Sequence, residues 1–87
     1  MKLARRTGAN MRSLRESRGL SPEALSSRSG IPLSAVVLFE NGAALPDLRQ
    51  LVAIADVLGT TPGAILAGVR WDQNQMRFEV DAPPGIA

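Results

Sequence analysis

The stretch from Ser21 to Gly42 (SPEALSSRSGIPLSAVVLFENG) places the strongest constraint on the fold, because it carries start and stop signals for two short helices. Ser21 is a typical N-cap, since its hydroxyl can accept a free backbone N–H of the first turn. Pro22 follows at the first helical position, where its missing N–H costs nothing. Gly30 can adopt the left-handed conformation that ends a helix. The pattern predicts two helices joined by a tight turn, which is a helix-turn-helix.

The apolar residues of this stretch fit two helices that share one core. Leu25 is predicted to point inward from the first helix. The buried set of the second helix is predicted to be Ile31, Val36 and Phe39, and Asn41-Gly42 ends that helix.

A further helix is predicted on the N-terminal side of this stretch. It runs from Thr7 or Gly8 to Arg18, with Met11 pointing inward. Residues 1–6 show no periodicity and are interpreted as a basic N-terminal arm.

Two more helices are predicted on the C-terminal side. Asp47 is expected to cap the fourth helix, and Gln50 three residues later would complete a capping box. This helix has a single apolar stripe made of Leu48, Leu51, Val52, Ala55 and Leu58. Thr61-Pro62 repeats the cap-plus-proline start, and a short fifth helix is expected to end near Ala67.

Residues 69–80 (VRWDQNQMRFEV) change to the period-2 alternation that is typical of β-strands. Trp71, Phe78 and Val80 alternate with charged residues on both sides of residues 72–75, which predicts a β-hairpin with a four-residue loop. Because a lone hairpin is marginal in water, it is expected to pack on the helices or to pair with a second copy. Residues 81–87 are interpreted as a tail.

The combination of these signals resembles the XRE family, the phage repressor and Cro type of helix-turn-helix domain, over residues 7–67. The matching pieces are Arg-x-x-Arg-Gly-Leu-Ser, Phe-Glu-Asn-Gly, Pro-x-Leu and Ala-x-x-Leu-Gly in register. The resemblance implies an all-α fold, a five-helix repressor-like helix-turn-helix domain over residues 7–68. The hairpin of residues 69–80 would be a short C-terminal extension.

In that family, the third helix enters the major groove of DNA and the second crosses the backbone. The resemblance therefore implies base-reading or groove-facing positions at Leu33, Ser34, Ala35, Val37 and Leu38. Phosphate contacts would come from Pro22 at the start of the second helix and from Asn41-Gly42, with Arg12 and Arg28 as candidate cations.

The five groove-facing positions carry one hydroxyl and four aliphatic groups, whereas base edges are usually discriminated by the forked donors Arg, Gln and Asn. What remains for sequence readout is methyl contact with thymine, the Ser34 hydroxyl and DNA shape. Two interpretations of Leu33, Val37 and Leu38 stay open. They form an interface to protein or DNA, or they pack under the N-terminal arm or the C-terminal hairpin.

Arg15 and Glu40 stand at family positions that form an ion pair between the first and third helices. A guanidinium and a carboxylate can make two parallel charge-assisted hydrogen bonds, so a structural role is expected. For the hairpin, we expect its apolar residues to form a dimer interface; these are Trp71, Met76, Phe78 and Val80.

The composition argues against an enzyme. The chain of 87 residues has no histidine and no cysteine, so the commonest general base and the usual metal ligands are missing. No catalytic residue, metal or cofactor is expected. No apolar segment follows the basic start, so no signal peptide is predicted. No uninterrupted apolar run is longer than Ala35 to Phe39, which is too short to span a bilayer. A cytoplasmic protein is expected.

The charge distribution fits a polyanionic partner. The net charge of the chain is only +2, but residues 1–30 carry +5 and residues 31–87 carry −3. The sequence predicts a sequence-specific DNA-binding transcriptional regulator, a repressor that binds double-stranded DNA as a homodimer. The alternative is a protein-interaction module on the same fold, of the antitoxin type.

Overall fold

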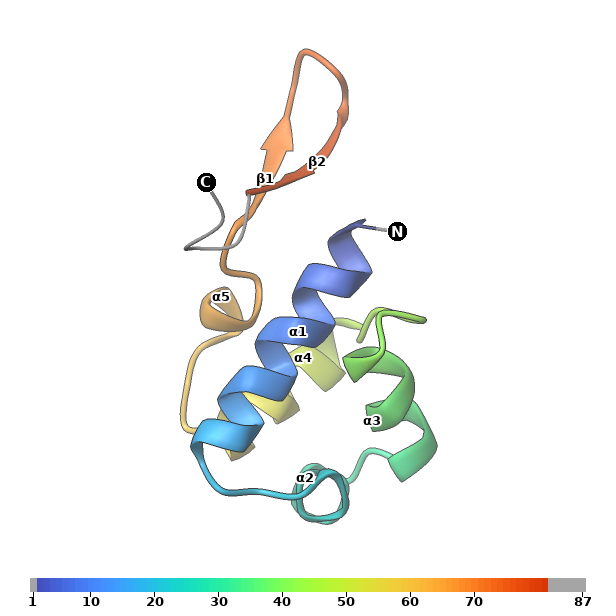
Figure 1. The fold of residues 1–87 in the computed structure, drawn as a ribbon, viewed down its shortest axis with the longest axis vertical. Helices are drawn as coiled ribbons and strands as arrows, with labels where there is room; N and C mark the ends of the chain where they lie inside the picture. Colours follow the sequence, from blue (N-terminus) through green and yellow to red (C-terminus); the bar gives the residue numbers. More distant parts are fainter. Residues whose placement is uncertain (1, 82–87) are drawn as a thin grey trace.

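The computed structural model describes residues 2–81, which form five helices followed by a two-stranded antiparallel hairpin (Figure 1). This confirms the expected five-helix fold with a C-terminal hairpin. The elements are α1 (Lys2–Ser17), α2 (Pro22–Ser29), α3 (Leu33–Glu40), α4 (Leu48–Val57), α5 (Pro62–Ile65), β1 (Val69–Asp72) and β2 (Arg77–Val80).

Helix α1 runs through the middle of the helical body and begins earlier than predicted (Figure 1). The prediction of an aperiodic basic arm was wrong, because the helix already starts at Lys2. The reason is that the inward face of its N-terminal half is made of small residues, which hydrophobic periodicity does not detect. The buried residues of α1 recur with helical spacing and are Ala4, Thr7, Gly8, Met11 and Arg15.

Side chains of α1, and of Arg18 directly after it, also complete the ends of other helices. Asn10 Nδ2 donates to the carbonyl oxygens of Ile65 and Ala67, at 2.8 and 2.9 Å. Arg18 Nε donates to the Leu58 carbonyl at 2.7 Å. The last carbonyls of α4 and α5 would otherwise lack partners, so these bonds fix both helices to α1.

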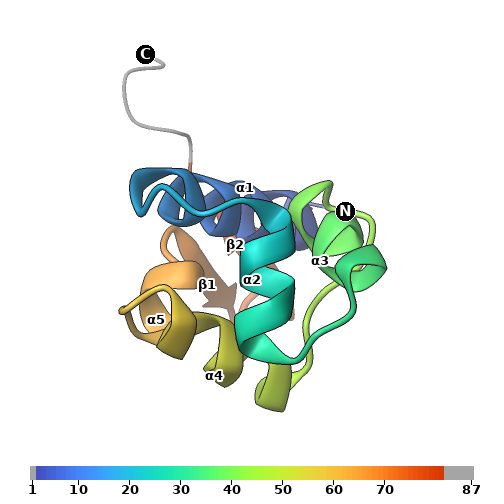
Figure 2. The same cartoon turned by 90° about the horizontal axis from the view of Figure 1, so that it is seen from below.

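The helix-turn-helix has the predicted local chemistry. The Ser21 hydroxyl accepts the Ala24 N–H at 3.1 Å, and Gly30 ends α2 with φ of 75°. Pro32 precedes α3 without a capping oxygen. Figure 1 views α2 end-on while α3 runs across that direction, and Figure 2 shows α2 along its length, so the two helices cross steeply.

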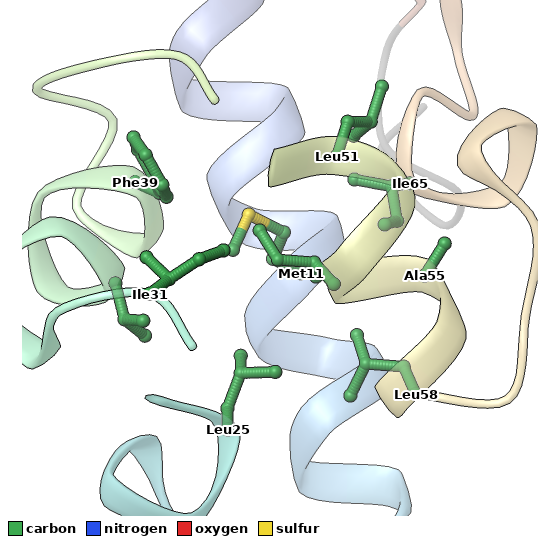
Figure 3. Packing of buried hydrophobic residues seen from close by; sticks show 10 residues of the cluster. Met11, Leu25, Ile31, Phe39, Leu51, Ala55, Leu58 and Ile65 are labelled. Atoms are coloured by element: carbon green, nitrogen blue, oxygen red, sulfur yellow. The ribbon is translucent and has the colours of Figure 1, made fainter. Parts of the chain in front are cut away.

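The core forms where all five helices meet, with the Met11 side chain reaching between α3 and α4 (Figure 3). The predicted inward residues Leu25, Ile31, Val36 and Phe39 are all buried. The cluster is completed by Leu51, Ile54, Ala55, Leu58 and Ile65.

The predicted stripe on α4 was partly wrong. The capping box of Asp47 and Gln50 is present. However, Leu48 is 77% exposed and Val52 is 50% exposed, whereas Ile54 is fully buried. Leu48 is the first residue of the helix and lies one turn before the core, so its place in the helical repeat does not bring it into contact.

The hairpin has the predicted alternation but a loop that begins one residue later. The loop is residues 73–76, and the Asp72 carboxylate accepts the backbone N–H groups of Asn74 and Gln75. Trp71 pairs with Phe78 across the two strands. Met76, the last residue of the loop, has a positive φ of 55°.

The hairpin rests on α1 and projects from the helical body at the end opposite α2 (Figure 1). Arg6 donates to the Asp81 carbonyl, and the Asp81 N–H donates to Gly68. Of the two expected arrangements, the structure shows the hairpin packed on the helices of its own chain, through α1. The predicted tail lies outside the described residues except for Asp81.

Among residues 2–81, none of the helices combines the length and the apolar composition needed to cross a membrane.

Candidate nucleic-acid interface

The outer face of α3 is an exposed apolar surface. Leu33, Val37 and Leu38 are 39%, 43% and 48% exposed, and Ser34 is exposed beside them. These four residues form two overlapping i, i+4 pairs and share one side of the helix. Their exposure excludes the alternative in which the N-terminal segment or the hairpin covers them. We call Leu33, Ser34, Val37 and Leu38 the α3 outer face.

The fifth predicted position is different. Ala35 is partly buried and packs against the core. The opposite side of α3 also carries Val36, Phe39 and Glu40, which are all buried. Ala35 therefore belongs to the side of the helix that fixes α3 to the domain.

Arg15 and Glu40 form the predicted ion pair. Arg15 Nε donates to Glu40 Oε2 at 2.7 Å, and Nη2 donates to Oε1 at 2.9 Å. Arg15 Nη1 also donates to the Leu20 carbonyl at 2.8 Å. Both side chains are buried. The pair joins the end of α1 to the end of α3 and leaves no free carboxylate at the end of α3.

The hydrogen bonds that Arg15 donates to Glu40 raise the pKa of Arg15, against the opposite effect of burial. A raised pKa in the folded state gives stability that is complete below the usual arginine pKa and is lost only as the pH rises above it. The Arg15 guanidinium therefore remains charged across the neutral range.

Arg12 lies one turn before Arg15 and reaches the C-terminal end of α3. Its Nη2 donates to Asn41 Oδ1 at 2.9 Å, and its Nε lies 3.5 Å from Glu40 Oε1. Because the Arg12 side chain is still half exposed, its charge stays near the surface. The structure thus brings two predicted phosphate-contact residues, Arg12 and Asn41, together.

Two glycines allow α1 and the end of α3 to touch through their backbones. A Cβ atom at Gly8 would lie 2.1 Å from the Phe39 carbonyl oxygen. Gly42 has φ of 75°, and a Cβ there would lie 2.9 Å from Arg5 Cα. Gly42, predicted as a phosphate contact, therefore also has a packing role.

The remaining predicted residues lie around α2. Pro22 is partly buried at the start of α2, and Arg28 is exposed in its last turn, just before the turn that leads into α3. Arg49 was not predicted. It lines a shallow cleft of about 270 Å³ beside Pro32, at the N-terminal end of α3.

Arg5 was also missed as a candidate cation, since it was assigned to an arm. It is exposed on α1 next to Gly42. The signal that could have placed it was Gly8, because a glycine inside a helical pattern often marks a close packing contact. Exposed cations thus lie near both ends of α3, with Arg5 and Arg12 at the C-terminal end.

The hairpin presents a second apolar surface. Trp71 and Phe78 pack edge to face with ring centroids 5.2 Å apart, yet they are 51% and 53% exposed. Met76 is exposed in the loop, while Val80 is partly buried near α1. Within residues 2–81, no group of three or more acidic side chains is arranged to hold a metal ion.

The comparisons with known proteins agree with this geometry. Residues 6–67 match a family model described as a helix-turn-helix domain. The restriction-modification controller protein C.AhdI from Aeromonas hydrophila superposes with a TM-score of 0.72 and 29% identity, over 75% of this chain and 98% of that chain. No curated protein matches the sequence.

Two larger proteins contain a similar domain. A transcriptional regulator of the HTH_3 family from Vibrio cholerae has a TM-score of 0.71 and 27% identity, over 76% of this chain and 37% of that chain. The hydroxypropylphosphonic acid epoxidase from S. wedmorenis has a TM-score of 0.68 and 33% identity, over 80% of this chain and 38% of that chain.

The family match extends from Arg6 in α1 to Ala67 after α5 and so includes all five helices, most of α1 among them. The resemblance to repressor-type domains is confirmed by the match to the regulators of Aeromonas and Vibrio. The chain belongs to the helix-turn-helix domain family.

Proposed function

We propose that this chain is a sequence-specific DNA-binding transcriptional regulator that places α3 in the major groove. The observation that supports this most is the exposed α3 outer face, because the opposite side of the same helix is fixed by the Arg15–Glu40 pair. A helix held on one side and free on the other suits insertion into a groove. Further support comes from the similar structures, one of which is a transcriptional regulator and another a restriction-modification controller protein.

Phosphate contacts would come from the cations at the two ends of α3. Arg28 and Arg49 lie near its N-terminal end, and Arg5 and Arg12 lie near its C-terminal end. The strands of a duplex border the major groove on both sides, so charges at both ends of a groove-bound helix can reach phosphates.

The regulator would act in the cytoplasm as a repressor that occludes promoter DNA. We propose a homodimer built by the aromatic pair of the hairpin, since Trp71 and Phe78 remain half exposed on one face. A two-fold dimer would match two half-sites about 34 Å apart.

The proposal assigns no catalytic activity and no cofactor. Two of the serines of α2, Ser26 and Ser29, lack a neighbouring histidine, and their hydroxyls have structural partners. Ser26 Oγ donates to the Ile31 carbonyl at 2.6 Å, and Ser29 Oγ donates to the Ser26 carbonyl. Neither hydroxyl has the base that a nucleophile requires.

The second candidate is a protein-interaction module, in which the α3 outer face packs on another protein or domain. The observation that favours it is the aliphatic character of that face, which lacks any forked hydrogen-bond donor. The similarity to part of an epoxidase shows that the domain also occurs within a larger enzyme.

Binding to duplex DNA at several salt concentrations separates the two candidates. Each phosphate contact contributes about −0.9 to the slope of log affinity against log salt, so four cations predict a slope of roughly −3 to −4 per protomer. Val37→Asp is expected to abolish binding while leaving the helical circular dichroism unchanged, because Val37 is exposed.

Two charge variants provide the matched comparison. Arg28→Gln is expected to reduce the slope by about one, whereas Arg77→Gln on the hairpin leaves it unchanged. Binding that does not weaken as salt rises, or no binding to any duplex, would favour the protein-interaction candidate instead.

A further inference from the structure

We propose that α3 recognises its DNA site through the C5-methyl groups of thymine, so that the preferred half-site is rich in A·T pairs. This inference rests on the proposed DNA-binding function and adds the chemistry by which bases are distinguished. It names Leu33, Val37 and Leu38 as the residues that determine specificity.

The side chains of the α3 outer face offer almost no hydrogen bonds. Leu33, Val37 and Leu38 are exposed hydrocarbon, and Ser34 is the only residue of the face with a polar side-chain group. Ser34 can bond to several base edges and so discriminates weakly. The face therefore cannot distinguish bases by the donor and acceptor pattern that Arg, Gln and Asn recognise.

The base pairs of a major groove differ in the groups that an apolar face can contact. Both A·T and G·C pairs present two acceptors and one donor in the groove, and the thymine methyl is the one apolar group, which only an A·T pair adds. Covering the polar groups with leucine or valine removes their water without replacing the hydrogen bonds, and only the methyl of an A·T pair offsets this cost. The same side chains thus favour A·T pairs over G·C pairs.

The charges around the face identify DNA as its occupant. The only charged residue of α3 is Glu40, and its carboxylate is buried against Arg15. Exposed arginines lie near both ends of the helix, with Arg28 before it and Arg12 at Asn41 after it. An apolar strip with cations at both ends complements a groove with methyl groups on its floor and phosphates on its rims.

The test starts with selection of bound duplexes from a random DNA library by the full chain. The preferred duplex is expected to have A·T-rich half-sites. Each thymine is then replaced singly by deoxyuridine, which removes the methyl group and keeps the base pair. Binding is expected to weaken about fourfold at each contacted thymine, the effect of burying one methyl-sized group.

Two variants connect this loss to α3. In Leu38→Ala, the affinity ratio between the thymine and deoxyuridine duplexes should fall to about one at one or more positions. Leu48→Ala, which shortens an exposed leucine on α4, should keep the fourfold ratio.

The results that overturn the inference differ from those that overturn the function. Selection of G·C-rich sites, or equal affinity for thymine and deoxyuridine duplexes, would overturn thymine-methyl recognition and leave DNA binding intact. Failure to select any duplex would overturn both.

Discussion

At the scale of single residues, the two buried charges have the largest consequence. Arg15 and Glu40 are both buried, and each is paired through two hydrogen bonds with the other. A buried pair of this kind contributes little net stability over a well-packed apolar pair, but the removal of one partner leaves the other charge buried without compensation. The pair also orients α3 relative to α1.

Arg15→Met is therefore expected to destabilise the domain by about 2–4 kcal/mol, because Glu40 is left buried and unpaired. Urea denaturation followed by circular dichroism measures this. Arg12→Met is the control, since its side chain is half exposed and its contact with Glu40 is long, so it should cost at most about 1 kcal/mol. A denaturation midpoint unchanged by Arg15→Met would show that the pair has no structural role.

At the scale of the elements, α1 determines where α3 stands. The helices approach so closely at Gly8 that the helix has no room for a side chain there. One turn further along α1, Arg12 binds Asn41, and Arg15 binds Glu40 one turn after that. These three contacts lie along one line and hold the C-terminal half of α3, so the α3 outer face stays turned away from α1.

Gly8→Ala tests this close approach. The new methyl group would overlap the Phe39 carbonyl, which is backbone and cannot move aside cheaply, so a loss of about 1–3 kcal/mol is expected. Gly63→Ala is the matched control, because its nearest neighbour would be an ordinary 3.7 Å from the new atom. Thermal unfolding compares the two. Equal stability of both variants would mean that the helices can separate at Gly8 without cost.

At the scale of the whole molecule, two apolar surfaces stand on different elements. The α3 outer face belongs to the helix-turn-helix, whereas the aromatic pair stands on the hairpin that projects beyond α1 (Figure 1). A two-stranded hairpin has unpaired edges, and a symmetry-related copy can cover both an edge and its aromatic face. This separation lets one surface form a dimer while the other remains free for DNA.

Trp71→Asp and Phe78→Asp are each expected to convert the proposed dimer to a monomer, since either charge would be buried in the proposed interface. Sedimentation equilibrium measures the change. Val52→Asp on α4 is the control, because Val52 is as exposed as the aromatic residues but lies on another element. A dimer that survives both hairpin variants and dissociates with Val52→Asp would place the interface on α4.

The predictions from the sequence were correct where the signal acts between residues that are close along the chain. The caps at Ser21, Asp47 and Thr61 use partners three residues away, so the residue types alone specify them. The hairpin alternation is equally local, and only its loop was placed one residue early. The pairing of Arg15 with Glu40 was predicted from the family resemblance.

What the sequence by itself determined was the order and type of the elements, because helix caps, glycine stops and periodicity act within a few residues. The tertiary structure decided which surfaces remain free, because that depends on neighbours distant along the chain. Small residues on α1 pack against α3 although they show no apolar periodicity in the sequence. Lys2–Arg6 are therefore helical where the sequence predicted an arm. Leu48 fits the apolar periodicity of α4 but lies too far from the core to contact it, and so it is exposed.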